Sequence, residues 1–236
     1  MMLVLGFPAQ AFATNCYIVA PAAGEECLVI DPGIGVVDQL AEVLAQHRLR
    51  PAAVLATHGH LDHVFSVTPV CGAYGVALSV HSQDRYRLVD PVAELGPELR
   101  QMFVQQFGAS GWKEPDDVVT LEDNQRLNIA GIEIGVIHAP GHTEGSVMFT
   151  LPGIPDDLTA SVELTSTVLS GDVLFAGSIG RTDLPGGSAA AMARSLRDRV
   201  LPMADATLVL PGHGGPTTIG QERVSNPYLG QAGRAG

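Results

Sequence analysis

Three imidazoles and one carboxylate lie within six residues, in the segment His58-Gly59-His60-Leu61-Asp62-His63. Such a segment would make a poor hydrophobic core and an unusual surface. Imidazole nitrogens and carboxylate oxygens are ligands that suit divalent zinc, iron or manganese. We expect His58 and His60, two residues apart on an extended turn, to face one metal ion. Asp62 and His63 follow at the start of a helix and are expected to face a second ion.

Three later residues stand in a similar setting. His142 and His213 each follow a Pro-Gly pair, and Asp172 follows a glycine, which lets the backbone turn sharply. We predict that the two histidines complete the two ligand sets and that Asp172, with its two carboxylate oxygens, bridges them. Seven ligands that share one bridge leave an open position for a water or hydroxide. An open position is typical of a catalytic rather than a structural metal site.

The candidate ligands follow short apolar runs rich in β-branched residues, a pattern that predicts strands. Strands are expected over residues 3–7, 16–20, 27–30, 53–56, 76–80, 132–137, 146–151, 167–169 and 207–210. Apolar residues at helical spacing predict helices over residues 36–47, 63–74, 91–107 and 189–200. Residues 152–157, with two prolines and a glycine, are expected to form a surface loop. Strand pairs at both ends of the chain, with helices between, indicate a layered α/β fold.

The composition indicates a folded chain of one domain. Apolar residues make up 46% of the 236 residues and charged residues 16%, which excludes an intrinsically disordered protein. No internal repeat or interdomain linker interrupts the pattern, so we expect a single domain over residues 1–236. The chain has 25 acidic and 13 basic residues, a formal net charge of −12, which argues against a nucleic-acid partner.

The first 24 residues carry no charged side chain, but they do not resemble an export signal or a membrane span. No Lys or Arg precedes the apolar stretch, and Pro8 and Pro21 interrupt it. We therefore expect no membrane partner and a cytoplasmic location. The spacing of Cys16, Cys27 and Cys71 matches neither a disulfide framework nor a zinc ribbon, so buried, reduced thiols are expected.

The order of the motifs resembles that of the metallo-β-lactamase superfamily. These motifs are His-x-His-x-Asp-His at 58–63, Pro-Gly-His-Thr at 140–143, Gly-Asp at 171–172 and Pro-Gly-His at 211–213. The resemblance spans nearly the whole chain and implies an αββα four-layer sandwich with metals at one edge. Asp31-Pro32-Gly33 resembles the superfamily's first motif, in which the aspartate supports the metal loop.

Two segments narrow the resemblance further. Residues 171–188, which contain Gly180-Arg181-Thr182-Asp183, and residues 218–229 resemble the glyoxalase II-like (hydroxyacylglutathione hydrolase-like) enzymes of the short bacterial type. Full-length glyoxalase II enzymes add a C-terminal helical domain that holds glutathione, and this chain stops soon after Leu229. We therefore expect no such domain, and the thiol carrier stays open. The commonest zinc β-lactamases have a cysteine where this chain has Asp172, which disfavours antibiotic hydrolysis.

The resemblance implies a metal-dependent hydrolase of 2-hydroxyacyl thioesters, a class of small-molecule substrate. Two divalent metal ions are expected, zinc first, with iron or manganese as alternatives. A hydroxide bridging the two metals would attack the thioester carbonyl, with Asp62 and Asp172 as the catalytic carboxylates. Because a thiolate leaves readily, no serine or cysteine nucleophile is required.

Several further residues are given roles around this site. Asp31, Thr57 and Thr143 are expected to orient the ligand rings, as Ser146 would. Arg181 is expected either to bind substrate or to pair with Asp183. The remaining positions are interpreted as structural, with a substrate wall as the alternative for the aromatic ones: His47, His81, His138, Tyr86, Phe103, Phe107 and Trp112.

Three alternatives remain open. A mononuclear iron persulfide dioxygenase would use His58, His142 and Asp172, and it would replace hydrolysis with oxygen chemistry. A lactone or ester hydrolase of the same fold would use the same hydroxide. A scaffold protein without activity is disfavoured, because all seven ligands are present. The sequence does not indicate an oligomeric state.

Overall fold

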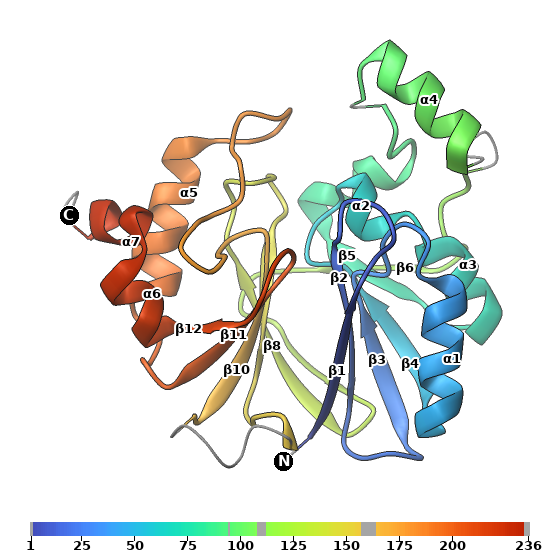
Figure 1. Cartoon of the computed structure of the whole chain (residues 1–236), viewed down its shortest axis with the longest axis horizontal. Helices are drawn as coiled ribbons and strands as arrows, with labels where there is room; N and C mark the ends of the chain where they lie inside the picture. The colour runs from blue at the N-terminus through green and yellow to red at the C-terminus, as the bar shows by residue number, and fades with distance from the viewer. Residues whose placement is uncertain (1, 94, 108–111, 157–163, 234–236) are drawn as a thin grey trace.

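Two six-stranded sheets pack face to face, and helices cover the outer face of each (Figure 1). The computed structural model describes residues 2–93, 95–107, 112–156 and 164–233. The first sheet has the strand order β1-β2-β3-β4-β5-β6. Its strands are β1 (Leu3–Pro8), β2 (Asn15–Ala20), β3 (Glu26–Ile30), β4 (Arg50–Leu55), β5 (Leu78–His81) and β6 (Val118–Leu121). The architecture is the αββα sandwich that the sequence predicted.

The second sheet has the strand order β12-β11-β10-β9-β8-β7. Its strands are β7 (Arg126–Ile129), β8 (Ile132–His138), β9 (Val147–Leu151), β10 (Ser166–Gly171), β11 (Thr207–Pro211) and β12 (Thr217–Thr218). Strand β9 is antiparallel to both β8 and β10, and β11 is parallel to β10. Strands β8, β10 and β11 therefore run in the same direction and end at the same edge.

Helices on the outer faces cover the two sheets (Figure 1). The helical elements are α1 (Val37–His47), α2 (Leu61–Val64), α3 (Val67–Tyr74), η1 (Ser82–Leu88), α4 (Pro97–Phe107), α5 (Ala189–Ser195), η4 (Leu196–Val200), α6 (Ile219–Ser225) and α7 (Pro227–Ala232). Among the described residues, none of these helices has the length and hydrophobicity needed to cross a membrane.

Strict alternation of apolar side chains builds the layers. Along β2, Cys16 and Ile18 point to the cluster under α1 and α3, whereas Tyr17 and Val19 point to the cluster between the sheets. The second sheet shows the same alternation, since Val168 packs with the helical layer of α5, α6 and α7 while its neighbour Leu169 packs between the sheets. Because side chains alternate across a strand, two apolar faces per sheet require cover on both sides.

The predicted strands are confirmed with small shifts at their ends, but two predicted helices have different bounds. The helix expected over 63–74 is broken at Ser66, whose N–H and hydroxyl donate to the carbonyls of Pro32 (3.0 Å) and Gly33 (2.6 Å). These bonds tie the break to the loop of Asp31. The helix expected over 91–107 begins only at Pro97, because residues 91–93 form a turn and residues 95 and 96 are not helical.

The helix expected over 189–200 continues through α5 into a π-helical turn, η4. Ser195, at the junction, donates its hydroxyl to the carbonyl of Pro140 at 2.7 Å, next to the loop of His142. Residues 152–156 form a surface loop in which Pro155 forms an isolated parallel β-bridge with Met2. Residue 157 lies outside the described residues.

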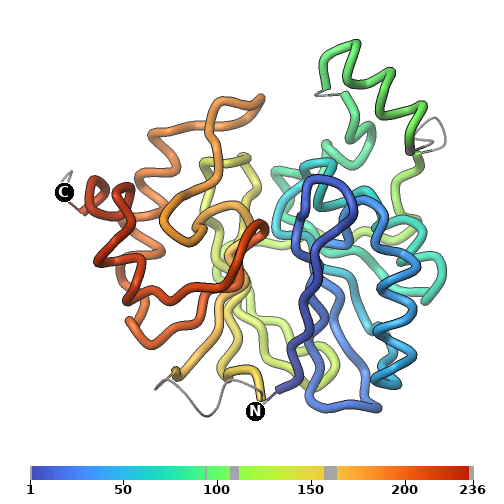
Figure 2. The backbone as a smooth tube through the Cα atoms, in the orientation of Figure 1, coloured from blue at the N-terminus to red at the C-terminus, as the bar shows by residue number. Residues whose placement is uncertain are grey.

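Two loops far apart in the sequence meet at the edge of the sandwich. Figure 2 shows the loop after β11, in red, beside the loop between β1 and β2, in dark blue. The N–H of Asn15 donates to the carbonyl of Gly212 at 2.7 Å, and Thr14 pairs with His213. This contact joins the two sheets at the edge where the histidines gather.

Candidate metal centre

Four strand ends bring the candidate ligands together at one edge of the sandwich. The loop after β4 carries His58, His60 and the start of α2, and the loops after β8, β10 and β11 carry His142, Asp172 and His213. All seven residues predicted as ligands lie in this cluster. Whether they bind metal is a prediction that the geometry supports.

Six of the seven side chains fall into two groups of donors, and a third group, formed by His58, His63 and Asp172, links the two. In the first, donor atoms of His58, His60 and His142 all lie within 4.8 Å of one another, and His60 Nδ1 is 2.8 Å from His142 Nε2. In the second, Asp62, His63 and His213 meet the same criterion. These are the two sets that the sequence predicted.

Asp172 lies between the two groups. One of its oxygens, Oδ2, is 3.5 Å from Nε2 of His142 in the first group and 3.6 Å from Nε2 of His213 in the second. The other oxygen, Oδ1, is 3.4 Å from Nε2 of His63. A carboxylate in this position can serve both groups at once. A side chain at Gly212 would collide with Oδ1, so the glycine permits this close approach.

Unused donor atoms show that the cluster fits divalent cations. Nε2 of His58, Nε2 of His63 and Oδ1 of Asp172 are buried and make no hydrogen bond to any described residue. Burying a polar atom without a partner costs free energy, and native proteins rarely accept several such atoms in one place. Bound metal ions would satisfy these atoms, and imidazole with carboxylate is a donor set that suits zinc, iron and manganese.

Hydrogen bonds on the far side of the rings aim the Nε2 atoms at the cluster. Nδ1 of His142 donates to the carbonyl of Arg181 at 2.7 Å, and Nδ1 of His213 donates to the carbonyl of Phe12 at 3.1 Å. Because a carbonyl can only accept, the proton sits on Nδ1 and the Nε2 lone pair faces inward. His60 is the exception, since it turns Nδ1 toward the first group.

Asp31 and Thr57 orient two rings of the cluster. Oδ1 of Asp31 accepts from the Thr57 N–H at 2.7 Å, and Oδ2 accepts from the Thr57 hydroxyl at 2.6 Å and from Nδ1 of His63 at 2.9 Å. The Thr57 hydroxyl therefore accepts from Nδ1 of His58 at 3.1 Å. Asp31 has a positive φ of 51°, a strained conformation, and its carboxylate contacts His63 directly and His58 through the Thr57 hydroxyl.

Asp31→Asn should weaken metal binding at the group of Asp62, His63 and His213 by about 10-fold to 100-fold. The amide keeps the size of the side chain but adds donors where Asp31 now accepts three hydrogen bonds, so His63 loses its fixed ring orientation. Competition with a chromophoric chelator measures the metal affinity of each site. Equal affinity in the variant and the native protein would contradict the role of Asp31.

Burial and charge set the protonation of the rings. Burial lowers the pKa of His58, and the neighbouring histidines lower it further; burial and His142 lower the pKa of His60 to about 3. Both rings are therefore neutral at neutral pH, as metal ligands must be. Burial also opposes the charge of His63, but Asp62, Asp172 and Asp31 outweigh it and hold its pKa above the usual range.

The carboxylates of the cluster are ionised. Burial raises the pKa of Asp172, but the positive field of His63 and the other rings outweighs burial and lowers it. The pKa of Asp62 is lowered in the same way by His63, His213 and a hydrogen bond of 2.8 Å from the Thr14 hydroxyl. The ionised carboxylates hold a proton on His63 in the metal-free cluster, and they would equally attract a metal cation in its place.

Asp84 is a supporting residue that the sequence interpretation missed. Its carboxylate is fully buried and accepts from the N–H of Gly59 at 2.8 Å, the N–H of Gly145 at 2.8 Å and the hydroxyl of Thr143 at 2.7 Å. It thus joins the loop of His58 and His60 to the loop that follows His142. A Cβ at Gly145 would stand 2.6 Å from Cγ of Asp84, so this contact requires glycine.

Thr143 supports the site through Asp84 rather than by touching a ring. Its hydroxyl donates to Asp84, and its N–H donates to the Ser146 hydroxyl at 3.0 Å. Ser146 in turn donates to the Thr143 oxygen at 2.8 Å, because the Thr143 proton is already engaged. The two residues stabilise the turn after His142.

Arg87 extends the same network to a third loop. Its Nε approaches Asp84 at 3.4 Å, and its Nη2 donates to Glu144 at 2.7 Å and to the carbonyl of Pro185 at 2.9 Å. The guanidinium is almost completely buried. It therefore links η1 to the loop of Glu144 and to the loop of residues 178–187.

Arg181 contributes its backbone to the site, while its side chain points to solvent. The carbonyl holds His142, and the guanidinium pairs with both oxygens of Asp183 at 2.8 and 2.7 Å. The side chain is 61% exposed. Pairing within the loop is therefore observed, and contact with a substrate remains a prediction.

Other residues singled out in the sequence lie outside the cluster. The rings of His81 and His138 stack at 4.1 Å, and His138 Nε2 donates to the carbonyl of Glu144 at 2.7 Å. Phe103 is buried, whereas Tyr86 is 54% exposed and pairs with Glu144 at 3.4 Å. Three more residues were given structural roles: His47 ends α1, Trp112 donates to the Leu88 carbonyl, and the side chain of Phe107 lies outside the described part of the chain.

The three cysteines are buried free thiols, as the sequence predicted. Burial raises the pKa of Cys27 and Cys71 to about 12, and it raises that of Cys16 further. Thiols in this state are poor nucleophiles and poor metal ligands. They pack as small apolar residues in the first sheet and in α3.

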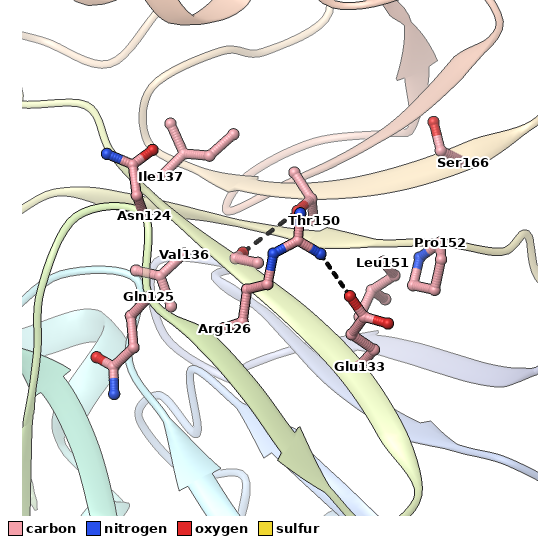
Figure 3. Close-up of a pocket in the computed structure, with 11 residues that line it drawn as sticks. Asn124, Gln125, Arg126, Glu133, Val136, Ile137, Thr150, Leu151, Pro152 and Ser166 are labelled. Atoms are coloured by element: carbon pink, nitrogen blue, oxygen red, sulfur yellow. Dashed lines mark hydrogen bonds and ion pairs between the residues drawn. The ribbon is translucent and has the colours of Figure 1, made fainter.

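A cavity of about 820 Å³ opens onto the ligand cluster. His60, Asp62 and Asp172 form part of its wall, and Phe103 of α4 forms part of another. A second hollow of about 390 Å³ lies on strands β7, β8 and β9 (Figure 3). There Arg126 pairs with Glu133 at 2.6 Å, and none of the seven candidate ligands lines it. The chemistry therefore belongs to the cavity over the cluster.

The fold and the cluster define a metal-dependent hydrolase of the metallo-β-lactamase superfamily. The model of that superfamily matches residues 9–213, so the chain belongs to it. An uncharacterized protein of Mycobacterium tuberculosis is 44% identical over 229 residues, covering 97% of this chain and 98% of that protein. Hydroxyacylglutathione hydrolase GloC of Haemophilus influenzae is 32% identical over 228 residues, covering 94% and 95%.

Two solved structures share the fold across almost the whole chain. The crystal structure of BLEG-1, a B3 metallo-β-lactamase, is 32% identical, covers 96% of this chain and 99% of that one, and has a TM-score of 0.76. The crystal structure of TTHA1623 in a di-iron-bound form is 33% identical, covers 95% and 99%, and has a TM-score of 0.72.

Proposed function

We propose that this protein is a dinuclear metal hydrolase of 2-hydroxyacyl thioesters, of the glyoxalase II-like kind. The observation that carries the proposal is Asp172, which lies between two groups of inward-facing donors and can serve both. The likeness to GloC, whose name is hydroxyacylglutathione hydrolase, supports the class of substrate.

The donors divide naturally between two ions. His58, His60 and His142 would hold one, and Asp62, His63 and His213 would hold the other, with Asp172 shared. Bound divalent metals polarise a carbonyl and lower the pKa of bound water toward neutrality. Zinc is proposed first, with manganese or iron as alternatives; the di-iron form of TTHA1623 supports iron.

The residues of the chain orient the reacting groups. The Thr14 hydroxyl donates to one oxygen of Asp62 at 2.8 Å, which fixes that carboxylate in the wall of the cavity. We propose that Asp62 orients the attacking water by accepting a hydrogen bond from it. Hydrolysis adds water across the carbonyl carbon–sulfur bond, releasing a carboxylate and a thiol. The thiolate needs little assistance as a leaving group, because free thiols have a pKa of about 8.5.

Arg181→Ala should raise KM by about threefold to tenfold with little change in kcat, if the guanidinium contacts the substrate. A small effect is expected, because Asp183 already shares the charge of Arg181 in solvent. Steady-state kinetics on metal-loaded protein measures both constants. An unchanged KM would assign Arg181 to the loop pair alone.

Paired assays distinguish the proposed hydrolase from the iron persulfide dioxygenase. A dioxygenase using His58, His142 and Asp172 would leave the group of His63 and His213 without a role. We expect thioester cleavage on protein of defined metal content. One iron per chain with oxygen uptake on a thiol persulfide, and no thioester cleavage, would overturn the proposal.

Lactones, esters and a β-lactam belong in the same panel. The same site can attack other activated carbonyls, and BLEG-1 is described as a B3 metallo-β-lactamase. We expect thioesters to give the highest kcat/KM. A lactone, or a β-lactam, cleaved at least about tenfold better than every thioester would replace the proposed substrate class.

A further inference from the structure

Part of the cavity wall is apolar and is built by one helix. Leu99, Met102 and Phe103 of α4 line it, at the spacing that places side chains on one face of a helix, and Leu95 adds to it from just before the helix. Figure 1 shows α4 projecting beyond the sheet edge where the loops of the cluster gather.

Helix α4 has one buried aromatic side chain that anchors it and two exposed apolar side chains beside that anchor. Phe103 is 5% exposed and packs edge-to-face on Phe65 at 5.3 Å, within a small cluster that includes Ile34 and Leu61. Leu99 and Met102, which flank this anchor, are each 55% exposed and line the cavity. Large apolar side chains left exposed beside a reaction site commonly mark a binding surface.

The cavity offers little to an anionic carrier. Among its described lining residues Arg181 is the sole Lys or Arg, and Asp183 already binds it through both oxygens. Arg100, on α4, pairs with Asp90 at 2.8 Å and does not line the cavity. The other charged lining residues, Asp62 and Asp172, are acidic. Glutathione carries two carboxylates, and recognition of carboxylates ordinarily uses unpaired cations.

We propose that the substrate carries an apolar chain that lies along α4 against Leu99 and Met102, and that its thiol carrier is not glutathione. This inference rests on the proposed thioester hydrolysis, and it names the chemistry on either side of the bond that breaks. The apolar chain belongs to the acyl group or to the thiol. One cavity could hold both the apolar chain and the bond that breaks, because its apolar wall is continuous with the cluster of His60, Asp62 and Asp172.

Two substrate series test the proposal on metal-loaded protein. One keeps N-acetylcysteamine as the thiol and lengthens the acyl group from lactoyl to 2-hydroxyoctanoyl. The other keeps the lactoyl group and lengthens an alkanethiol. We expect kcat/KM to rise about twofold to fourfold for each methylene in one of the series. That series identifies which side of the bond carries the chain. Lactoylglutathione should react no faster than lactoyl-N-acetylcysteamine.

A charged wall should remove this gain. In Leu99→Glu/Met102→Glu the dependence on chain length is expected to disappear. The matched control is Gln101→Glu/Gln105→Glu, which adds the same charge to exposed positions of α4 that do not line the cavity. It should keep the gain. Leu99→Ala/Met102→Ala, without added charge, should reduce it, and this variant covers the case in which the glutamates disturb folding.

A binding measurement separates this inference from the proposed function. The Kd of S-octyl-N-acetylcysteamine, a thioether that cannot be hydrolysed, should be at least about tenfold lower than that of the S-ethyl compound. If this holds while no thioester is cleaved, the proposed function fails and the apolar site stands. If thioesters are cleaved without any gain from chain length, or lactoylglutathione is preferred about tenfold, the inference is overturned and the hydrolase stands.

Discussion

Replacing Asp172 with alanine is expected to remove both metal ions and to lower kcat/KM for thioester hydrolysis by at least about a thousandfold. The two oxygens of Asp172 lie 3.4 to 3.6 Å from nitrogens of both donor groups, so its loss affects both at once. The variant also loses a negative charge that offsets the charge of the cations. Metal content per chain after gel filtration and steady-state kinetics measure the two effects.

The control for this variant is Asp183→Ala. Asp183 is an exposed aspartate that pairs with Arg181 and is not a member of the donor groups. It should keep both metals, so a difference between the two variants reports the position of Asp172. An Asp172→Ala protein that retains two metals per chain would show that Asp172 does not bridge the site.

Replacing Asp84 with alanine should lower the free energy of unfolding of the metal-free protein by about 3–5 kcal/mol. The change would leave two backbone N–H groups, the Thr143 hydroxyl and the Nε of Arg87 without the acceptor that they now share. It would also release the loop of His58 and His60 from the loop of His142. We therefore expect weaker metal binding as well. Urea denaturation measures the stability.

Asp90→Ala provides the matched comparison for Asp84. Asp90 also pairs with an arginine, Arg100, but both side chains are 40% or more exposed. Exposed ion pairs contribute about 0–1 kcal/mol, so this variant should be nearly as stable as the native protein. Equal, small losses of stability in the two variants would contradict the role given to Asp84.

The sequence predicted the members of the cluster because each signal was local. A histidine or aspartate follows a strand and a glycine within a few residues, so it can be recognised without knowledge of the fold. Asp31 and Thr57 followed from a motif and from their position next to a ligand. The structure brings all of these residues together, and it places Oδ2 of Asp31 at 2.9 Å from Nδ1 of His63. Binding of metal by the cluster stays a prediction.

Asp84 could not be recognised in the same way. Its partners Gly59, Thr143 and Gly145 lie 25 to 61 residues away in the sequence. An aspartate at the start of a helical segment is ordinarily interpreted as an exposed residue that stabilises the helix N-terminus. The supporting role of Asp84 depends on the packing of two loops that are distant in the sequence. No pattern near Asp84 in the sequence indicates that packing.

The strands that the sequence did not predict, and the helix whose bounds differ, also depend on tertiary contacts. Strands β6 and β7 are mostly exposed or half-buried, so they lack the apolar alternation that marks a strand, and β12 has only two residues. The break between α2 and α3 depends on bonds from Ser66 to the loop of Asp31. Tertiary contacts decide such details, whereas the long buried strands follow from their own pattern.

Titration of the metal-free protein with a single divalent metal, while thioester hydrolysis is followed in the same samples, tests the central claim most directly. The two groups of donors joined by Asp172 predict that activity rises until two equivalents per chain are bound and then stays constant. Saturation of binding at one equivalent, or full occupancy by two metals with no thioester cleaved, would contradict the proposed dinuclear thioester hydrolase.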